Sequence, residues 1–247
     1  GDSVIGTARQ SNTVTGSGSK DLSAWSLDFS DRACSQRAII GLIEAHPEVD
    51  VLVNNAGYGL LGAFEEVSDD QLREAFDVNL FGGLDLIRAY LPGMRARGWG
   101  RVVQMSSITG VTSGAGGAGY AGPKAALEAV SDALAAEVEL FGVGVTVVEP
   151  GAFRTDFTGR SLRRAEPLPH YQSSVGRACD AFVAAHGTQR GDPDLAAQAI
   201  IDAVLSSNPP RRLPVGPDAY STLRAHYRAR LAELETSQAS AATTDLS

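Results

Sequence analysis

Two residues stand out for the chemistry that their spacing allows. Tyr120 and Lys124 lie four positions apart in a segment predicted to be helical, and Lys124 is one of only two lysines, with Lys20, in a chain whose other basic residues are arginines. Side chains four apart on a helix project from one face, so the phenol and the ammonium lie close together. A nearby ammonium favours the phenolate, so we expect the pKa of Tyr120 to fall from about 10 towards working pH. Such a tyrosine can transfer a proton.

A serine hydroxyl is expected beside this pair. Ser107 stands thirteen residues before Tyr120, just beyond a strand predicted over 101–105. In a parallel sheet, the carboxyl end of a strand and the first turn of the next helix meet in the same crevice. A hydroxyl there can bind a substrate carbonyl while the tyrosine transfers the proton. The alternative is that Ser106 and Ser107 are ordinary loop serines and the tyrosine–lysine spacing is a coincidence.

The elements that must position these side chains alternate between short apolar strands and amphipathic helices. This pattern predicts an α/β fold with a mainly parallel sheet. We expect Pro92 to interrupt the second helix and Pro123 to lie in the first turn of the third. One domain is predicted over 1–235, with a flexible tail over 236–247. Strands are predicted at 3–8, 24–29, 49–53, 101–105, 143–148 and 212–215, and helices at 31–45, 68–91, 120–141, 193–206 and 217–234.

In motif order and spacing, the chain resembles the short-chain dehydrogenase/reductase family. The resemblance covers essentially the whole chain and implies a Rossmann-like, doubly wound parallel sheet flanked by helices. The residues that carry it are Asn54, Asn55, Ala56 and Gly57 (the NNAG motif), Asn79, Ser107, Tyr120 and Lys124 (the tetrad), and Pro150, Gly151 and Thr155.

This resemblance implies an NAD(P)-dependent oxidoreductase that moves hydride between a nicotinamide and a ketone or secondary alcohol. Tyr120 would be the general acid/base, Ser107 would orient the carbonyl, and Lys124 would bind the nicotinamide ribose and lower the Tyr120 pKa. Asn79 would hold a water in the proton relay. Asn55, Ala56 and Gly57 would lie on the adenosine side of the cofactor, and Pro150, Gly151 and Thr155 would contact the nicotinamide carboxamide.

Cofactor choice depends on the residues at the end of the strand predicted at 3–8. A carboxylate there accepts from a ribose 2′-hydroxyl, whereas arginine favours a 2′-phosphate. Arg9 and Gln10 come directly after this strand, so NADP is predicted over NAD. Asp28 resembles the aspartate of the family that contacts adenine, and it could equally cap the helix that begins near Asp31.

The chain departs from the family at its first element, a strand, a TGxxxGxG turn and a helix. The stretch 15–19 (Thr-Gly-Ser-Gly-Ser) is a decoy, because Lys20 and Leu22 stand where later glycines belong and because it comes after the family's second strand. We therefore predict that the central strand and the glycine-rich turn are absent from this sequence, either because the sequence is incomplete or because the protein is truly truncated. A sheet without that strand has two unpaired edges.

Composition narrows the classes of partner. With 21 basic and 29 acidic residues the net charge is −8, which argues against nucleic acid and anionic lipid as partners. Two distant cysteines and four scattered histidines predict neither a disulfide scaffold nor a metal site. The apolar runs are strand-length and no signal peptide is recognised, so we expect no membrane association and a cytoplasmic location.

The substrate is predicted to be a small carbonyl or alcohol, bulky and hydrophobic if the nearly bare loop at 114–119 forms the mouth of the site. A lid is predicted over 155–191, carrying Phe157, Tyr171 and Phe182, with Tyr58 facing the same pocket. Alanines on the third helix and the family resemblance predict a homodimer or homotetramer. Two other functions stay open: a sugar-nucleotide epimerase or dehydratase of the same family, and a binding or regulatory protein that kept the fold without the cofactor turn.

Overall fold

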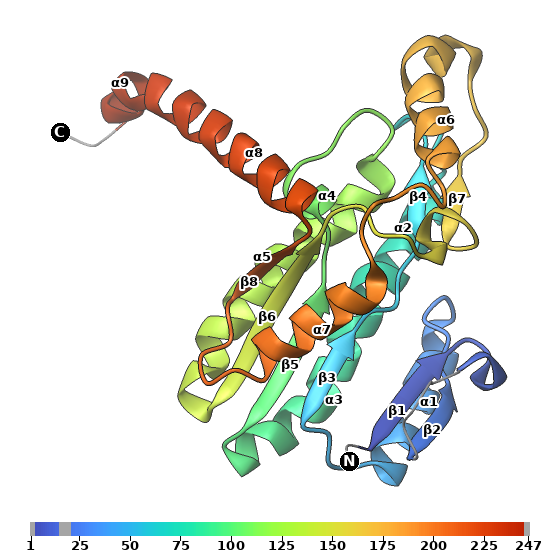
Figure 1. Cartoon of the computed structure of the whole chain (residues 1–247), viewed down its shortest axis with the longest axis vertical. Helices are drawn as coiled ribbons and strands as arrows, with labels where there is room; N and C mark the ends of the chain where they lie inside the picture. The colour runs from blue at the N-terminus through green and yellow to red at the C-terminus, as the bar shows by residue number, and fades with distance from the viewer. Residues whose placement is uncertain (1–2, 15–20, 245–247) are drawn as a thin grey trace.

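A parallel sheet flanked by helices forms the body of the molecule, as the sequence predicts (Figure 1). The computed structural model describes residues 3–14 and 21–244, so the decoy stretch 15–19 and Lys20 lie outside the described residues. The main sheet has four strands in the order β3-β5-β6-β8, and every adjacent pair is parallel. Its strands are β3 (Val51–Asn54), β5 (Gly100–Met105), β6 (Val143–Pro150) and β8 (Arg212–Val215).

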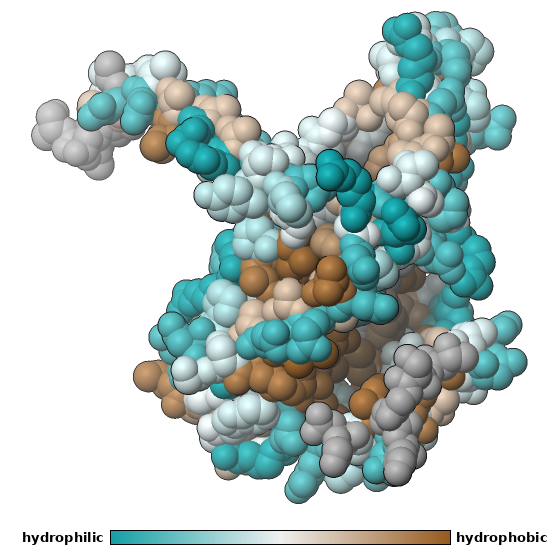
Figure 2. Space-filling view, in the orientation of Figure 1, coloured by the Kyte–Doolittle hydropathy of each residue, from teal (hydrophilic) through white to brown (hydrophobic). Residues whose placement is uncertain are grey.

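A second parallel pair, β1 (Val4–Ala8) with β2 (Leu22–Ser26), forms a separate sheet. The second strand therefore begins two residues earlier than predicted and ends before Phe29. Among the described residues, β1 pairs only with β2 and β3 only with β5, so the sheet is interrupted between β1 and β3. Val53 on the β3 edge is 51% exposed, and Figure 2 shows hydrophobic side chains around the hollow at this position. The interruption lies where the family's first strand is expected; its absence from the chain stays a prediction.

Helices cover both faces of the main sheet because strand side chains alternate between the faces. Val102 packs in a core with residues of α1 (Arg32–Ala45), α3 (Gly82–Arg97) and α5 (Ala118–Val138). Its neighbour Val103 packs in a second core, on the face covered by α7 (Pro193–Val204). Asp192 caps α7 by accepting from the amides of Asp194 and Leu195, so the predicted cap is confirmed.

The predicted helix from Ser68 is longer and less regular than expected. The capping box is confirmed, because Ser68 and Gln71 each accept from the other's backbone amide. The chain then continues without a break through α2 (Asp69–Phe76), a π-helical turn (Asp77–Phe81) and α3. Pro92 does not end the helix. It is exposed, and the buried neighbours Tyr90 and Met94 hold the helix in place.

The helix that carries Tyr120 also begins earlier than predicted. The amides of Tyr120 and Ala121 both bond to the carbonyl of Gly117, so α5 begins at Ala118 and Pro123 lies in its second turn, not its first. Pro123 is fully buried, and packing outweighs the loss of one helical hydrogen bond there.

The predicted lid contains a short strand that the sequence did not predict. β7 (Leu162–Arg164) pairs in parallel with β4 (Gly59–Leu61), directly after the NNAG motif. Arg163 reinforces this pairing, because its guanidinium lies 2.6 Å from Glu74 and stacks over the Tyr58 ring at 4.2 Å. The lid is therefore fastened to the body beside α5. It continues through α6 (Arg177–Ala184), which comes after a π-helical turn.

The last long helix, α8 (Pro217–Thr236), projects away from the body (Figure 1). The stretch from Thr236, predicted as a flexible tail, forms α9 (Gln238–Ala241) and a 3-10 turn (Ala242–Thr244). Its flexibility stays a prediction. Within the described ranges, no helix is long and apolar enough to cross a membrane, and no group of three or more His, Cys, Asp or Glu side chains could hold a metal ion.

A charged cluster ties β8 to α5 and β6. Arg212 forms ion pairs with Glu128 and Asp132 on α5, and its guanidinium lies 3.4 Å from Glu149 on β6. Glu128 and Glu149 are buried. Burial, and next the charge of Asp132, raise the pKa of Glu149. Arg212 thus neutralises carboxylates that would be costly to bury alone.

Candidate active site

The structure brings Ser107, Tyr120 and Lys124 together at the carboxyl end of β5. Ser107 lies two residues beyond this strand, and its hydroxyl caps the short helix α4 (Ile108–Val111) by accepting from the amide of Thr109 at 3.1 Å. The Ser107 side chain acts on the Tyr120 phenol and lowers its pKa, against the effect of burial. The Nζ atom of Lys124 lies 5.7 Å from the centroid of the Tyr120 ring. The spacing argument therefore placed these three side chains correctly.

Burial dominates the electrostatics of Lys124. Its side chain is only 4% exposed, and its Nζ atom donates a 2.5 Å hydrogen bond to the carbonyl of Met105. Burial lowers the pKa of Lys124 to about 8, because the charged form loses its hydration. A Cβ on Gly57 would lie 3.6 Å from this Nζ atom, so the NNAG glycine lies close to the ammonium.

Tyr120 departs from the expectation on its pKa. Burial raises the pKa of Tyr120 above its ordinary value, and the Ser107 side chain opposes this rise without cancelling it. The predicted lowering is therefore not present in this structure. The ring of Phe157, from the lid, lies 5.2 Å from the Tyr120 ring at an interplanar angle of 54° and contributes to that burial.

Asn79 lies in the π-helical turn between α2 and α3, and it is buried. Its side chain accepts from the amide of Tyr58 at 2.8 Å and donates to the carbonyl of Tyr58 at 3.0 Å. A Cβ on Gly57 would lie 2.7 Å from the Asn79 carboxamide oxygen, so only glycine fits there without displacement. The side chain of Asn79 therefore fixes the chain at Gly57 and Tyr58, beside Lys124.

The first residue of the NNAG motif is buried in the sheet, and the next two lie at the surface. Asn54 donates to Gln104 on the neighbouring strand β5 at 2.8 Å and to the carbonyl of Gly83 on α3 at 3.1 Å. This buried pair braces the sheet, as the family resemblance implies. Asn55 and Ala56 are exposed at the carboxyl end of β3, available to a ligand.

The segment that begins at Pro150 leaves the carboxyl end of β6. Gly151 donates to the carbonyl of Val215 on β8 at 3.0 Å. Thr155 is exposed and caps a 3-10 turn by accepting from the amide of Phe157 at 3.3 Å. The strand order β5-β6 places this segment next to the strand that leads to Ser107.

Arg9 and Asp28 lie just after β1 and β2, on the far side of the interruption in the sheet. Arg9 is exposed, and its carbonyl accepts from the Ser26 hydroxyl. Asp28 accepts from the amide and the hydroxyl of Ser30, whereas Asp31 caps α1. The alternative in which Asp28 caps that helix is therefore wrong. Within the described residues, no hydrogen bond or ion pair joins Arg9 or Asp28 to the tetrad.

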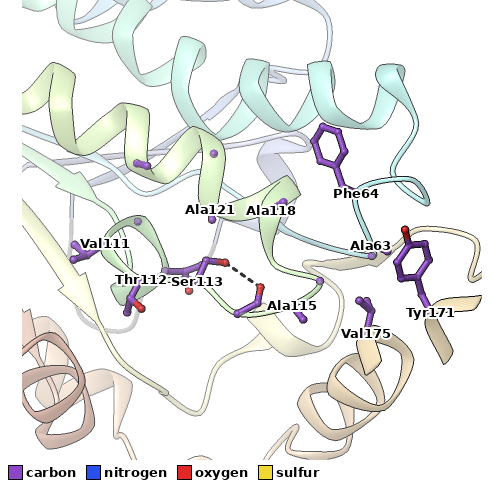
Figure 3. Close-up of a pocket in the computed structure, with 17 residues that line it drawn as sticks. Ala63, Phe64, Val111, Thr112, Ser113, Ala115, Ala118, Ala121, Tyr171 and Val175 are labelled. Carbon is purple, nitrogen blue, oxygen red and sulfur yellow. Dashed lines mark hydrogen bonds between the residues drawn. The ribbon is translucent and has the colours of Figure 1, made fainter. Parts of the chain in front are cut away.

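A cavity of about 680 Å³ opens beside α5, but the tetrad side chains do not line it. The face of α5 that borders it carries Ala118, Ala121, Gly122 and Ala125, and the nearly bare loop at 112–116 forms another wall. Figure 3 shows Phe64, Tyr171 and Val175 across from Val111 and Thr112. The expected roomy space at this loop exists. Tyr120 does not line this cavity, because its spacing from Ala118 and Gly122 puts it on another face of α5.

Three contacts at the site could not be predicted from the sequence: the β4–β7 pairing, the hydrogen bonds between Asn79 and the backbone of Tyr58, and a contact from α8 to the segment after Pro150. Each joins residues at least twenty positions apart, and three-residue strands give too little periodicity to recognise. The one sequence signal for the β4–β7 pairing is Gly59, because a Cβ there would collide with Leu162 of the lid strand.

Comparison with known proteins defines the class. The family model for short chain dehydrogenases matches residues 3–166. The chain therefore belongs to the short-chain dehydrogenase family.

Individual relatives agree with this assignment. Oxidoreductase BOA17 of Botryotinia fuckeliana is 34% identical over 223 residues, which is 89% of this chain and 81% of that one. The crystal structure of a short-chain dehydrogenase from Streptomyces avermitilis is 40% identical and superposes with a TM-score of 0.91, covering 99% of this chain and 91% of that chain. A metagenomic short-chain oxidoreductase in complex with NADP is 28% identical, with a TM-score of 0.57, covering 65% of this chain and 74% of that chain. The chain is thus similar to oxidoreductases along most of its length.

Proposed function

We propose that this protein is an NADP-dependent oxidoreductase that transfers hydride between the nicotinamide and a ketone or secondary alcohol, with Tyr120 as general acid/base. The observation that carries the proposal is the convergence of Ser107, Tyr120 and the buried Lys124 ammonium, whose Nζ atom lies 5.7 Å from the centroid of the Tyr120 ring. A phenol with a hydroxyl partner and a cation within reach suits proton transfer to a carbonyl oxygen.

The residues present fit the nicotinamide-ribose half of the cofactor. The Lys124 ammonium has three N–H donors, and Met105 is its hydrogen-bond partner within the described residues. The remaining donors suit ribose hydroxyls. Pro150, Gly151 and Thr155 lie at the adjacent strand end and suit the carboxamide. When bound, the nicotinamide supplies or accepts the hydride.

The chain's own groups would each have a distinct part in the reaction. Ser107 donates a hydrogen bond to the substrate carbonyl oxygen and orients it towards Tyr120. The Tyr120 phenol gives its proton to that oxygen in reduction and takes it back in oxidation. The charge of Lys124 stabilises the phenolate left behind. Asn79 keeps Gly57 and Tyr58 in place, and a role in relaying the proton through water is proposed for it on the family resemblance.

For the rest of the cofactor, the residues fit in part. The exposed Arg9 at the end of β1 suits a 2′-phosphate, which supports NADP over NAD, and the NADP complex of the metagenomic relative supports the same choice. Asn55, Ala56 and Asp28 are proposed contacts on the adenosine side. In the described part of the chain, no strand leads directly into a glycine-rich turn and a helix, so no cradle for the pyrophosphate is assigned.

The substrate is proposed to be a bulky hydrophobic carbonyl compound or alcohol. Phe157 lies against Tyr120 and presents an apolar surface where the reacting carbon would sit. Tyr58 is buried under the Arg163 guanidinium and does not face an open pocket, so no contact between Tyr58 and the substrate is proposed. A homodimer or homotetramer and a cytoplasmic location stay predictions.

A direct test mixes the protein with NADPH and monitors nicotinamide fluorescence, and then measures NADPH oxidation with a panel of aliphatic and aromatic ketones. Enhanced fluorescence and ketone-dependent oxidation are expected. Fluorescence enhancement without oxidation of any ketone, but with turnover of a sugar nucleotide, would favour the epimerase or dehydratase function. No enhancement at millimolar NADPH would favour a binding or regulatory protein, the candidate that the predicted absence of the glycine-rich turn supports.

A further inference from the structure

The root of α8 touches the segment proposed to contact the nicotinamide. A carboxylate oxygen of Asp218, in the first turn of α8, accepts a 2.7 Å hydrogen bond from the backbone amide of Ala152. Ala152 comes directly after Pro150 and Gly151. Residues 66 positions apart in sequence are thus joined at the mouth of the proposed site.

The geometry around this contact is close. A Cβ on Gly151 would collide with the carboxylate of Asp218, so the carboxylate lies directly against the backbone of Gly151. Gly216, which caps α8, has φ of +100°, a conformation that glycine adopts without strain, and a Cβ there would lie 2.7 Å from the same carboxylate. Both glycines therefore allow Asp218 to approach the segment.

Backbone hydrogen bonds hold the remainder of the segment. Gly151 donates to Val215, Arg154 donates to Gly191, and Gly191 donates back to Ala152. Within the described residues, Asp218 is the one side chain from another element that accepts from a backbone amide between Pro150 and Thr155. The carbonyl of Ala152 is therefore held by the backbone of Gly191, whereas its amide is held by the Asp218 carboxylate alone.

We propose that Asp218 is a positioning residue for the nicotinamide: by fixing the amide of Ala152 it sets the backbone of Pro150, Gly151 and Ala152 against which the carboxamide binds. This inference rests on the proposed function and extends it to the base of α8. Without the carboxylate, the turn can rotate, and a displacement of about 1 Å at a reacting group can lower a rate on the order of 100-fold.

The chain supplies a matched control. α7 and α8 both begin with Pro-Asp, and Asp194 occupies on α7 the position that Asp218 occupies on α8. Both aspartates add negative charge to the first turn of a helix, which stabilises it. The Asp194 carboxylate makes no hydrogen bond or ion pair within the described residues, so Asp194→Ala removes the same charge without touching the proposed site.

The experiment compares Asp218→Ala, Asp218→Asn and Asp194→Ala by NADPH-dependent ketone reduction and by hydrogen exchange at the Ala152 amide. For Asp218→Ala we expect kcat to fall about tenfold or more, the KM for NADPH to rise, and protection of the Ala152 amide to be lost. Asp218→Asn keeps an oxygen acceptor, so it is expected to retain most of the wild-type activity and most of the protection of the Ala152 amide. Asp194→Ala is expected to match the wild type in kinetics and in exchange at Ala152.

The outcomes separate this inference from the proposed function. Kinetics of Asp218→Ala within twofold of Asp194→Ala, in a wild type that reduces ketones, would overturn the role of Asp218 alone. Equal losses of activity in Asp218→Asn and Asp218→Ala would overturn the assignment of the Asp218 side-chain oxygen as the acceptor for the Ala152 amide. A wild type that neither binds NADPH nor turns over would overturn the proposed function, while loss of Ala152 protection only in Asp218→Ala would still establish the anchor.

Discussion

The buried ammonium of Lys124 donates a 2.5 Å hydrogen bond to the carbonyl of Met105, two residues before Ser107. This bond joins α5 to the end of β5, so the helix that carries Tyr120 is fixed against the strand that leads to Ser107. One side chain thereby holds the two hydroxyl groups of the proposed site in register. A guanidinium is planar and bulkier than an ammonium and does not fit the same geometry, which gives a physical reason for a lysine in a chain rich in arginine.

Removing the Tyr120 hydroxyl tests the proposed proton transfer. We expect Tyr120→Phe to lower kcat by 10²- to 10⁴-fold, roughly the share of general acid/base catalysis, with little change in melting temperature. Tyr90→Phe is the matched control, because Tyr90 is also a buried tyrosine and its hydroxyl has no partner within the described residues. Steady-state kinetics of the two variants decide the matter. Turnover by Tyr120→Phe equal to that of Tyr90→Phe would remove Tyr120 from the mechanism.

The lowered pKa of Lys124 predicts a pH-dependent stability. The pKa is about 8 in the folded chain and 10.5 ordinarily, so the unfolded chain binds this proton more tightly. Stability should therefore rise with pH between 8 and 10.5, by about 3 kcal/mol at most for this group. Lys124→Met lacks the titrating amine, so the unfolding free energy of the wild type should rise relative to that of this variant over that range. A difference measured by urea unfolding that stays constant from pH 7.5 to 10.5 would contradict the shift.

The Arg212 cluster predicts unequal costs for two adjacent arginines. Arg212→Met leaves the buried Glu128 and Glu149 without their cation, and breaking such a buried arrangement costs roughly 3–5 kcal/mol. Arg211 pairs with Glu139 at the surface, where both side chains are more than half exposed, so Arg211→Met should cost no more than about 1 kcal/mol. Urea unfolding at pH 7 measures both. Equal losses would mean that the cluster does not stabilise the contact of β8 with α5 and β6.

Local sequence signals predicted the parts of this molecule that local forces decide. The capping box at Ser68, the Pro-Asp starts of α7 and α8, and the tyrosine–lysine spacing on α5 each depend on neighbours within one or two helical turns. Pro92 and Pro123 misled the prediction of helix bounds because tertiary packing offset a local penalty. The β4–β7 pair and the Asp218 contact depend on long-range pairing that no short window contains.

The pKa of Tyr120 illustrates the same limit within the site. The approach of Lys124 could be predicted from a spacing of four, but the burial of the phenol depends on Phe157, which a loop of the lid brings over the ring. Desolvation acts on the phenol more strongly than the neighbouring groups do in this structure. Composition and spacing contain no measure of that burial, so the direction of the shift could not be foreseen.

The outer face of α5 bears on assembly. Ala125, Ala129, Ala133 and Ala136 are spaced along it, and small side chains let another helix approach closely. If copies associate through this face, Ala129→Arg should shift the protein towards monomer in sedimentation at micromolar concentration. Ala197→Arg, an exposed alanine on α7, is the control and should leave the assembly unchanged. A monomeric wild type, or loss of assembly in both variants, would count against this interface.

The interruption between β1 and β3 leads to a prediction about cofactor affinity. A chain of residues 1–247 presents Lys124, Asn55 and Thr155 to the cofactor, but no pyrophosphate cradle is assigned in its described part. Loss of such charge-assisted contacts weakens binding on the order of 10³-fold, so we expect this chain to bind NADPH no tighter than about millimolar. Adding a strand, a glycine-rich turn and a helix of the family type before Gly1 should pair both free edges and restore micromolar binding.

The same extension with valines in place of the turn glycines should raise the melting temperature alone, because the strand still pairs while the side chains exclude the phosphates. Calorimetry on the three chains measures the affinities, and micromolar binding by the unextended chain would mean that the pyrophosphate binds elsewhere in the molecule.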